Sequence, residues 1–293
     1  MNSAGQNQKP IPKISIGMFV YNGESSIREA IDSMLNQTFN DFELIISDNA
    51  STDNTEEVCR EYEKIDSRIR YIRQPTNLGA SVNFQIVFDE SKGEYFMWAA
   101  HDDIKSPDFL ELNLQFLQEH LDYVASTSPV RFIDDLPDPV RMGDKTLDQE
   151  TAADRFLAGL KTWRACGRFY SLIRRAAIVN SKVIRHATYV GADIALILEL
   201  AIKGKLNRLE QGYVALGRNG LSGSGNIFRM YRKSIKNWLF PMYELSTVIW
   251  ALADDFSFIG RVLIAKAIIE MNLITFLHQF KIEIIQWIQR VRR

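Results

Sequence analysis

The 293-residue chain has an ordinary globular composition, 46% hydrophobic and 24% charged, and is long enough for one large α/β domain with an appendage or two modest domains. Its 35 basic and 36 acidic side chains nearly cancel, which argues against binding nucleic acid by neutralising phosphates over the whole surface. Two cysteines, Cys59 and Cys166, are too few for a disulfide framework or a zinc site, and we expect small buried side chains in a reducing compartment.

Targeting signals are not evident in the sequence. Residues 1–13 are polar and lack the apolar stretch of a signal peptide. No segment offers the roughly 18 consecutive apolar residues of a membrane span. These features predict a cytoplasmic protein.

Strand-like and helix-like segments alternate along the N-terminal part of the chain. Short apolar, partly β-branched stretches predict strands at residues 14–21, 42–47, 68–73 and 94–100. Helical spacing and capping residues predict helices at residues 25–37, 51–65, 81–91 and 106–121. Repeated β-α-β units predict an α/β fold with a mainly parallel sheet flanked by helices.

The second half of the chain is less regular. Residues 129–148 are rich in Pro and Asp and predict a loop region, whereas residues 190–203 predict a helix. Five glycines within residues 212–225 predict an irregular stretch. From residue 226 the pattern is helical to the end, and this tail carries ten basic and five acidic side chains.

Polar clusters follow three of the predicted strands, and because ligands of such sheets bind beyond the carboxyl ends of the strands, we expect one shared crevice. The clusters are Tyr21-Asn22, Asp48-Asn49 and His101-Asp102-Asp103. Paired carboxylates suit Mg²⁺ or Mn²⁺, which prefer oxygen ligands and can bridge phosphates. Asp48 suits a hydrogen bond to a base or ribose, and Tyr21 offers a face for stacking.

At these residues the chain resembles glycosyltransferase family 2, whose members have the GT-A fold. The matching stretches are ISIGMFVYNGESSIREAIDSMLNQTFNDFELIISDNASTDNT, NLGAS and GEYFMWAAHDDIKSPDFL. The resemblance covers residues 14–121 and, more weakly, residues 162–217. It implies a GT-A nucleotide-diphospho-sugar transferase domain at 1–225, with a nucleotide-binding half at 12–122 and an acceptor half at 123–225, followed by a helical extension at 226–293.

The resemblance also implies roles for individual residues. The donor-binding residues would be Phe19, Tyr21, Asn22, Glu24, Asp48, Asn77, Gly79, Asp102 and Arg218. Asp103 would close the family's D-x-D motif as the ligand of a divalent metal, Mn²⁺ or Mg²⁺. Asp193 would act as general base on the acceptor hydroxyl in an inverting, single-displacement reaction.

Two positions depart from the family pattern. His101 stands where the D-x-D motif has its first carboxylate, and the segment at 216–220 keeps only Arg218 of a basic, His-containing run. Simpler interpretations also stand beside the functional ones. Asp48 and Asp53 fit turn and capping roles, and an acid such as Asp193 is favoured near a helix start on electrostatic grounds alone.

The resemblance implies a glycosyltransferase that moves a sugar from a UDP-sugar to a saccharide or lipid-linked acceptor, in cell-surface polysaccharide or glycolipid synthesis. Two alternatives stay open. A nucleotide-sugar-binding protein without activity would explain His101 and the missing late histidine. A nucleotidyltransferase would need a Gly-rich basic loop after the first strand, which residues 20–24 do not provide.

The last predicted helix has an apolar face made by Ile284, Ile285, Ile288 and Val291. Packing of this face on the catalytic domain is one explanation. The other is peripheral docking on the anionic inner face of a membrane, which Trp287 and the arginines at 290, 292 and 293 favour.

Overall fold

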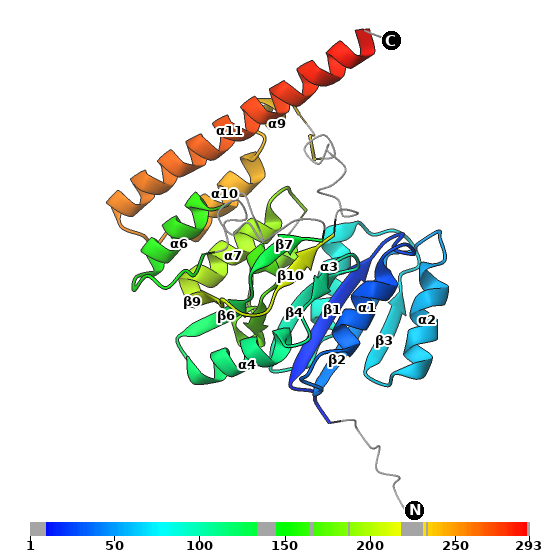
Figure 1. Ribbon diagram of the computed structural model, residues 1–293. Helices are drawn as coiled ribbons and strands as arrows, with labels where there is room; N and C mark the ends of the chain where they lie inside the picture. The colour runs from blue at the N-terminus through cyan, green and yellow to red at the C-terminus, as the bar shows by residue number, and fades with distance from the viewer. Residues whose placement is uncertain are drawn as a thin grey trace, which may run out of the picture.

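The computed structural model describes residues 10–133, 145–163, 167–186, 188–217, 231–232 and 234–291, without the side chains of residues 186, 286 and 289–291. A seven-stranded sheet in the order β3-β2-β1-β4-β8-β6-β9 forms its centre (Figure 1). The first four strands are β1 Ile14–Val20, β2 Phe42–Asp48, β3 Ile69–Arg73 and β4 Tyr95–Ala100, and they pair in parallel. The prediction of a mainly parallel sheet is therefore confirmed.

Three strands from the second half of the chain extend the same sheet. They are β6 Tyr123–Thr127, β8 Leu172–Arg174 and β9 Lys205–Arg208. β8 is antiparallel to both of its neighbours, β4 and β6, so β6 and its parallel partner β9 run in the direction of β4. The two predicted halves of the catalytic domain thus share one sheet.

Helices cover both faces of the sheet and enclose two separate cores (Figure 1). One face carries α1 Ile27–Leu35, α2 Thr55–Ile65 and α4 Phe109–Glu119. The other face carries α3 Ala80–Asp89, α6 Ala152–Lys161, α7 Ala192–Lys203 and α10 Tyr243–Leu252. A mixed α/β architecture with both sheet faces buried explains why the predicted strands are almost uniformly apolar.

Side-chain alternation along β1 assigns its residues to the two cores. Ile14, Ile16 and Met18 are buried on the side of α1 and α2. Gly17 faces α3, where an added Cβ would lie 2.6 Å from Cγ2 of Val87. The absence of a side chain at Gly17 therefore allows α3 to pack closely on the central strand.

A second, three-stranded sheet lies beside the first, in the order β5-β10-β7. Its strands are β5 Ile104–Lys105, β7 Val130–Phe132 and β10 Val214–Leu216. The prediction of irregular structure at 129–148 and 212–225 is wrong for β7 and β10, because strands of three residues are too short to show periodicity. Residues 134–144 and 218–225 lie outside the described part of the chain.

The predicted helical tail is confirmed over residues 234–291, where it forms α9 Ile235–Leu239, α10 and α11 Phe258–Val291. α10 packs on α7, and α11 lies over α10 and α6 along the outer edge of the molecule (Figure 1). Within the described ranges, no helix is both long enough and apolar enough to cross a membrane.

Candidate active site

The ends of β1, β2 and β4 form one edge of the sheet. Asp48, the last residue of β2, lies opposite Val20, and Ala100, the last residue of β4, lies opposite Phe19. Neighbouring strands lie about 4.8 Å apart, and β1 lies between β2 and β4. The ends of β2 and β4 are therefore about 10 Å from each other. Asp48 and the segment that follows Ala100 therefore open on one edge, as the sequence predicts.

Asp48 is fully buried, and protein groups bond both of its carboxylate oxygens. Oδ1 accepts the amide proton of Ser51 at 2.8 Å. Oδ2 accepts the Tyr71 hydroxyl and the Arg73 Nη1, each at 2.7 Å. The carboxylate is thus held in place before any ligand binds, which fits both the turn role and the nucleotide-binding role considered for it.

Arg73 is a site residue that the sequence did not reveal. Besides its bond to the Asp48 carboxylate, the guanidinium donates to the Ser51 carbonyl oxygen at 2.9 Å and lies 3.1 Å from Glu56 Oε2. Arg73 therefore fixes the loop between β2 and α2 at the carboxyl edge. Its place as the last residue of a strand next to β2 is the signal that could have identified it.

Asn22 and Glu24 bind the same loop from the other side. The Asn22 side-chain oxygen accepts the Thr52 amide proton at 2.8 Å, and the Asn22 amide donates to Ser51 Oγ at 2.8 Å. Asn22 adopts a positive φ of 53°, which a turn residue tolerates. Glu24 accepts the Asn54 side-chain amide at 2.7 Å. Both predicted donor-binding residues thus position the loop after β2.

Asp53 belongs to this loop as well. Its Oδ1 accepts the amide proton of Thr55 at 3.1 Å, and its Oδ2 accepts the amide proton of Glu24 at 3.1 Å. Burial acts to raise the pKa of Asp53, but the bonds from the Thr55 hydroxyl and from these amides together outweigh it and lower the pKa. Asp53 lies one residue before Asn54, the N-cap residue of α2, and bonds the first amide of the helix from there.

The predicted Asn77 and Gly79 lie in the loop before α3. Asn77 Oδ1 accepts protons from the Asn49 side chain and from the Gly79 amide, each at 2.9 Å. Gly79 has a φ of +85°, a conformation that favours glycine, and nothing lies within 4 Å of the place where its Cβ would be. These contacts hold the loop against the end of β2.

The aromatic candidates differ in their accessibility. Tyr21 is 44% exposed just after the end of β1. Phe19 is half-buried and packs against the core on the α3 side of the sheet. Of the two, only Tyr21 presents a substantial aromatic surface to solvent.

His101, Asp102 and Asp103 follow β4, as predicted. The His101 ring lies 3.2 Å from the Ser26 hydroxyl, and burial lowers its pKa. Asp102 and Asp103 are both almost fully buried. Asp103 Oδ1 accepts the amide proton of Gly217 at 3.0 Å, which links two positions 114 residues apart.

The second oxygen of Asp103 is not used by the part of the protein that the structure describes. Oδ2 is buried and has no hydrogen-bond partner among the described residues. Burial raises the pKa of Asp103 to about 6, and the nearby negative charge of Asp102 acts in the same direction. No group of three or more His, Cys, Asp or Glu side chains gathers in the described part of the chain, so a cation here would need further oxygens from phosphate or water.

Lys105 lies beneath this segment and is fully buried. Its ammonium group is 5.3 Å from the ring centroid of Tyr170 and 5.6 Å from that of Phe109. Burial lowers its pKa to about 8, while the charge of Asp103 opposes that shift. A positive charge therefore lies close to the paired acids, inside the protein.

The candidate base, Asp193, lies in the first turn of α7. Because α7 leads into β9, which runs parallel to β6, the start of α7 lies at the carboxyl edge of the sheet. Burial raises the pKa of the neighbouring Tyr189, and the charge of Asp193 adds to that effect. The topology thus brings Asp193 to the same edge as Asp48 and Asp103.

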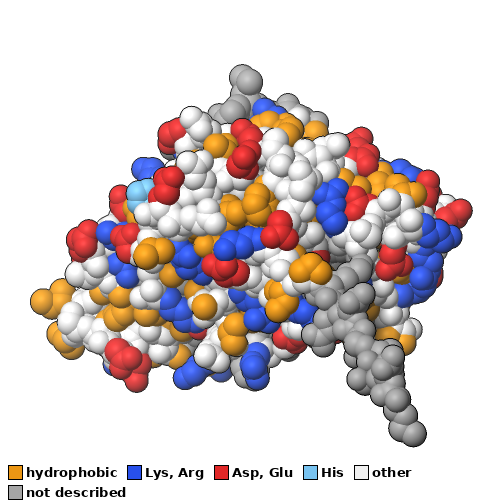
Figure 2. Space-filling view, turned by 90° about the horizontal axis from the view of Figure 1, so that it is seen from below, with side chains coloured by type: hydrophobic (Ala, Val, Ile, Leu, Met, Phe, Trp, Pro, Cys, Tyr) orange, Lys and Arg blue, Asp and Glu red, His pale blue; other side chains and the backbone are white. Residues whose placement is uncertain are grey.

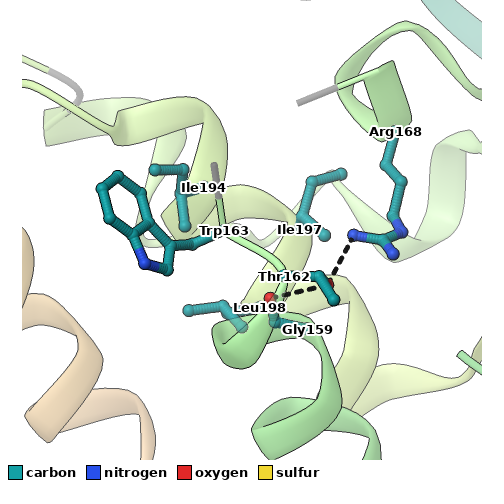
Figure 3. Close-up of a pocket in the computed structure, with 7 residues that line it drawn as sticks. All are labelled: Gly159, Thr162, Trp163, Arg168, Ile194, Ile197 and Leu198. Carbon is teal, nitrogen blue, oxygen red and sulfur yellow. Dashed lines mark hydrogen bonds between the residues drawn. The ribbon is translucent and has the colours of Figure 1, made fainter. Parts of the chain in front are cut away.

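A small crevice, open to solvent, lies where the end of α6 and the segment after it meet α7 (Figure 3). Ile194, the residue after Asp193, lines it together with Trp163, whose ring lies next to Ile194 in the close-up. Arg168 closes one side and donates to the Thr162 hydroxyl at 3.3 Å. The crevice adjoins the start of α7 and is mostly apolar.

Two sequence predictions fall outside the described residues. Arg218, the candidate for the donor diphosphate, follows Gly217, where the described segment ends. Cys166 also lies outside, whereas Cys59 is a buried free thiol, as expected.

The model of Glycosyl transferase family 2 matches residues 15–179, more than half of the chain. EpsE of Bacillus subtilis (strain 168), named as a glycosyltransferase, is 34% identical over 113 residues, which are 38% of this chain and 41% of EpsE. TuaG of the same organism, named for teichuronic acid biosynthesis, is 34% identical over 39% of this chain and 44% of TuaG. The chain therefore spans less than half of these relatives.

The fold is similar to that of a solved structure, residues 1–349 of S. aureus TarS in complex with UDP-GlcNAc. The two superpose with a TM-score of 0.65 at 18% identity, over 87% of this chain and 71% of that one. At this identity the likeness establishes the shared fold alone.

Proposed function

Because the chain belongs to glycosyl transferase family 2, we propose that it transfers a sugar from a nucleotide diphosphate donor to an acceptor hydroxyl, with inversion at the anomeric carbon. The observation that carries the proposal is the gathering of Asp48, Asp102, Asp103 and the start of α7 at one sheet edge. The name of TuaG, which refers to teichuronic acid biosynthesis, supports a role in cell-surface polysaccharide or glycolipid synthesis.

The donor in this proposal is a UDP-sugar, since the similar TarS structure holds UDP-GlcNAc. The exposed ring of Tyr21 would stack on the base. The loop that Asp48 and Arg73 fix would supply polar contacts to base and ribose. Such preformed polar groups lower the entropic cost of binding.

The reaction would be a single displacement. The acceptor oxygen attacks the anomeric carbon from the side opposite the diphosphate, and the bond between that carbon and the diphosphate oxygen breaks. The proton of the acceptor hydroxyl passes to the Asp193 carboxylate, while the bonding electron pair leaves with the diphosphate. Asp193 fits this role because the first turn of α7 lies at the sheet edge that also carries Asp103.

Asp103 is the residue we propose as ligand of a divalent cation, Mn²⁺ or Mg²⁺, through its unpartnered Oδ2. Such a cation, when bound, offsets the negative charge that develops on the leaving diphosphate. Asp102 would hold the ribose region beside it. His101, whose ring lies against Ser26, would position this segment rather than bind the metal.

The test compares the same substitution at three acids. We expect Asp193→Asn to lower kcat at least about a hundredfold while nucleotide binding persists, because only proton transfer is lost. Asp103→Asn should abolish the Mn²⁺-dependent part of the rise in melting temperature caused by UDP. Asp122→Asn, a matched change at an exposed acid before β6, should alter neither. Turnover of UDP-sugars and thermal shift provide the two measurements.

Each outcome has a defined meaning. Full turnover in Asp193→Asn would remove Asp193 as the base. Binding of UDP or of UDP-sugars without turnover, over a panel of saccharide and lipid-linked acceptors, would favour the non-catalytic binding protein. Stabilisation by another nucleoside diphosphate, but not by UDP, would reassign the donor base.

A further inference from the structure

α11 exposes a long apolar surface. The helix has 34 residues and is therefore about 50 Å long. Thirteen of its side chains are large hydrophobic groups exposed to solvent. On the face of the molecule in Figure 2, by contrast, apolar side chains lie scattered among charged ones. We call this surface the apolar face of α11; its members include Val262, Ile269, Leu273, Leu277, Phe280 and Trp287.

The opposite side of α11 is already occupied by the protein. Ile264 and Met271 are buried in the core that α6, α7 and α10 share. Asn272 accepts the amide proton of Met242 at 3.1 Å and donates to the Ser246 hydroxyl at 2.8 Å. The helix is thus anchored with its apolar face outward, and the exposure is not the result of a detached helix.

The width of this face distinguishes between possible occupants. At 100° per residue, the exposed apolar side chains cover about half of the helix circumference. A seam between two helices needs only a narrow stripe at heptad positions, flanked by charges that select the partner. A broad apolar face with aromatic side chains instead suits the boundary between lipid headgroups and acyl chains.

The charges near this face complement an anionic surface. Lys266 and Lys281 are exposed on α11. Three acids of the tail, Glu283, Asp254 and Glu270, pair with Arg232, Arg261 and Lys266. The sequence adds three further arginines at positions 290, 292 and 293, and the whole tail has twice as many basic as acidic residues.

α11 and the carboxyl edge of the central sheet lie toward the same side of the molecule. β1 starts beside the N-terminal segment at the bottom of Figure 1 and runs toward the side on which α11 lies. The carboxyl edge of the sheet, with the candidate active site, therefore faces the same side of the molecule as α11. A surface bound by α11 would lie on the side of the molecule that carries the candidate active site.

We propose that the apolar face of α11 docks the protein on a membrane surface that carries anionic phospholipids. The apolar side chains enter the headgroup boundary, and the lysines and arginines of the tail contact lipid phosphates. This docking is independent of the proposed sugar transfer, because it needs neither donor nor acceptor. It favours acceptors that are themselves lipid-linked.

The experiment is co-sedimentation of the full chain with vesicles of phosphatidylcholine, with and without about 30 mol% phosphatidylglycerol. We expect at least about tenfold tighter binding to the anionic vesicles than to the neutral ones. Raising NaCl to about 0.5 M should weaken the binding to the anionic vesicles. Leu273→Gln/Phe280→Gln should weaken the binding at least about tenfold. The control is Ile65→Gln/Leu121→Gln, the same change at two exposed apolar residues of the catalytic domain, which should bind like the wild type.

The melting temperature of each variant, followed by circular dichroism without nucleotide, shows whether the protein remains folded. Absence of wild-type binding to anionic vesicles, or equal binding by the α11 variant, would overturn the proposal. So would a concentration-dependent dimer in sedimentation velocity that Leu273→Gln/Phe280→Gln abolishes, because a second copy would then cover the face. None of these results bears on whether the protein transfers sugar.

Discussion

Gly217 shows how a single residue shapes the candidate site. Its amide donates to Asp103, and a Cβ at this position would lie 2.5 Å from Asp102 Oδ2 and closer still to the Asp102 carbonyl oxygen. Gly217 thus bonds Asp103 through its amide, and an added side chain would clash with Asp102. The segment after β10 can therefore approach the acids only if it carries no side chain at this point.

We predict that Gly217→Ala displaces the Asp102-Asp103 segment and lowers kcat/KM roughly a hundredfold, because a displacement of about 1 Å in a catalytic group has that effect. Turnover of a UDP-sugar is the measurement. Gly260→Ala is the control, since its Cβ would meet only ordinary contacts, the nearest at 3.4 Å. Unchanged kcat/KM in Gly217→Ala would show that the acids tolerate the displacement.

At the scale of elements, α3 connects the ends of β1 and β2. Asn83 is almost fully buried, and its side-chain amide donates to the Ser47 carbonyl at 2.9 Å. Its oxygen accepts the Ser47 hydroxyl at 2.6 Å. One helix residue thus satisfies polar groups at the strand end that carries Asp48. The sequence alone does not single out Asn83, because a polar residue on an amphipathic helix resembles a solvent-facing one.

We expect Asn83→Ala to lower the free energy of unfolding by about 2 to 3 kcal/mol, because it leaves buried partners of Asn83 unsatisfied. Ser47→Ala should lower the free energy of unfolding by about 1 kcal/mol. The double variant should lose less than the sum of the two single losses, which corresponds to a coupling of about 1 kcal/mol. Urea unfolding of the four chains gives these values. Additive effects within error would mean that the two residues do not interact.

At the scale of the whole molecule, the sheet separates two cores, and Cys59 is buried in the one on the α1 and α2 side. Burial raises the pKa of its thiol from an ordinary value of 9.0 to about 12. Between pH 9.0 and about pH 12, the thiol therefore stays protonated in the folded protein but loses its proton in the unfolded chain. The resulting contribution to stability is complete below pH 9 and is lost as the pH rises toward 12.

A thiol reagent can test this burial in a chain that also carries Cys166→Ser. At pH 8 we expect Cys59 in the folded protein to react at least about a thousandfold more slowly than in urea, because only the exposed thiolate reacts. The doubly substituted chain, with Cys59→Ser as well, gives the background. Rapid reaction of the folded protein would show that this core opens without global unfolding.

Most elements of residues 14–121 follow from the sequence alone, with the exception of the two-residue strand β5. Apolar runs and helical spacing fixed four strands and their helices to within a few residues, apart from the start of α2. The rule for parallel strands is enough to place Asp48, Asp102 and Asp103 at one edge. These features are local, so short stretches of sequence carry them. The family resemblance, now confirmed, rests on the same stretches.

How distant segments complete that edge depends on the packing of the whole chain. β10 pairs with β5 and brings Gly217 to Asp103, and β8 turns the chain so that α7 starts beside the strand ends. Arg73 emerged for the same reason, through its contacts with Asp48 and Ser51. Strands of two or three residues have no period to detect. Their partners lie up to about a hundred residues away, so packing over the whole chain determines the pairing.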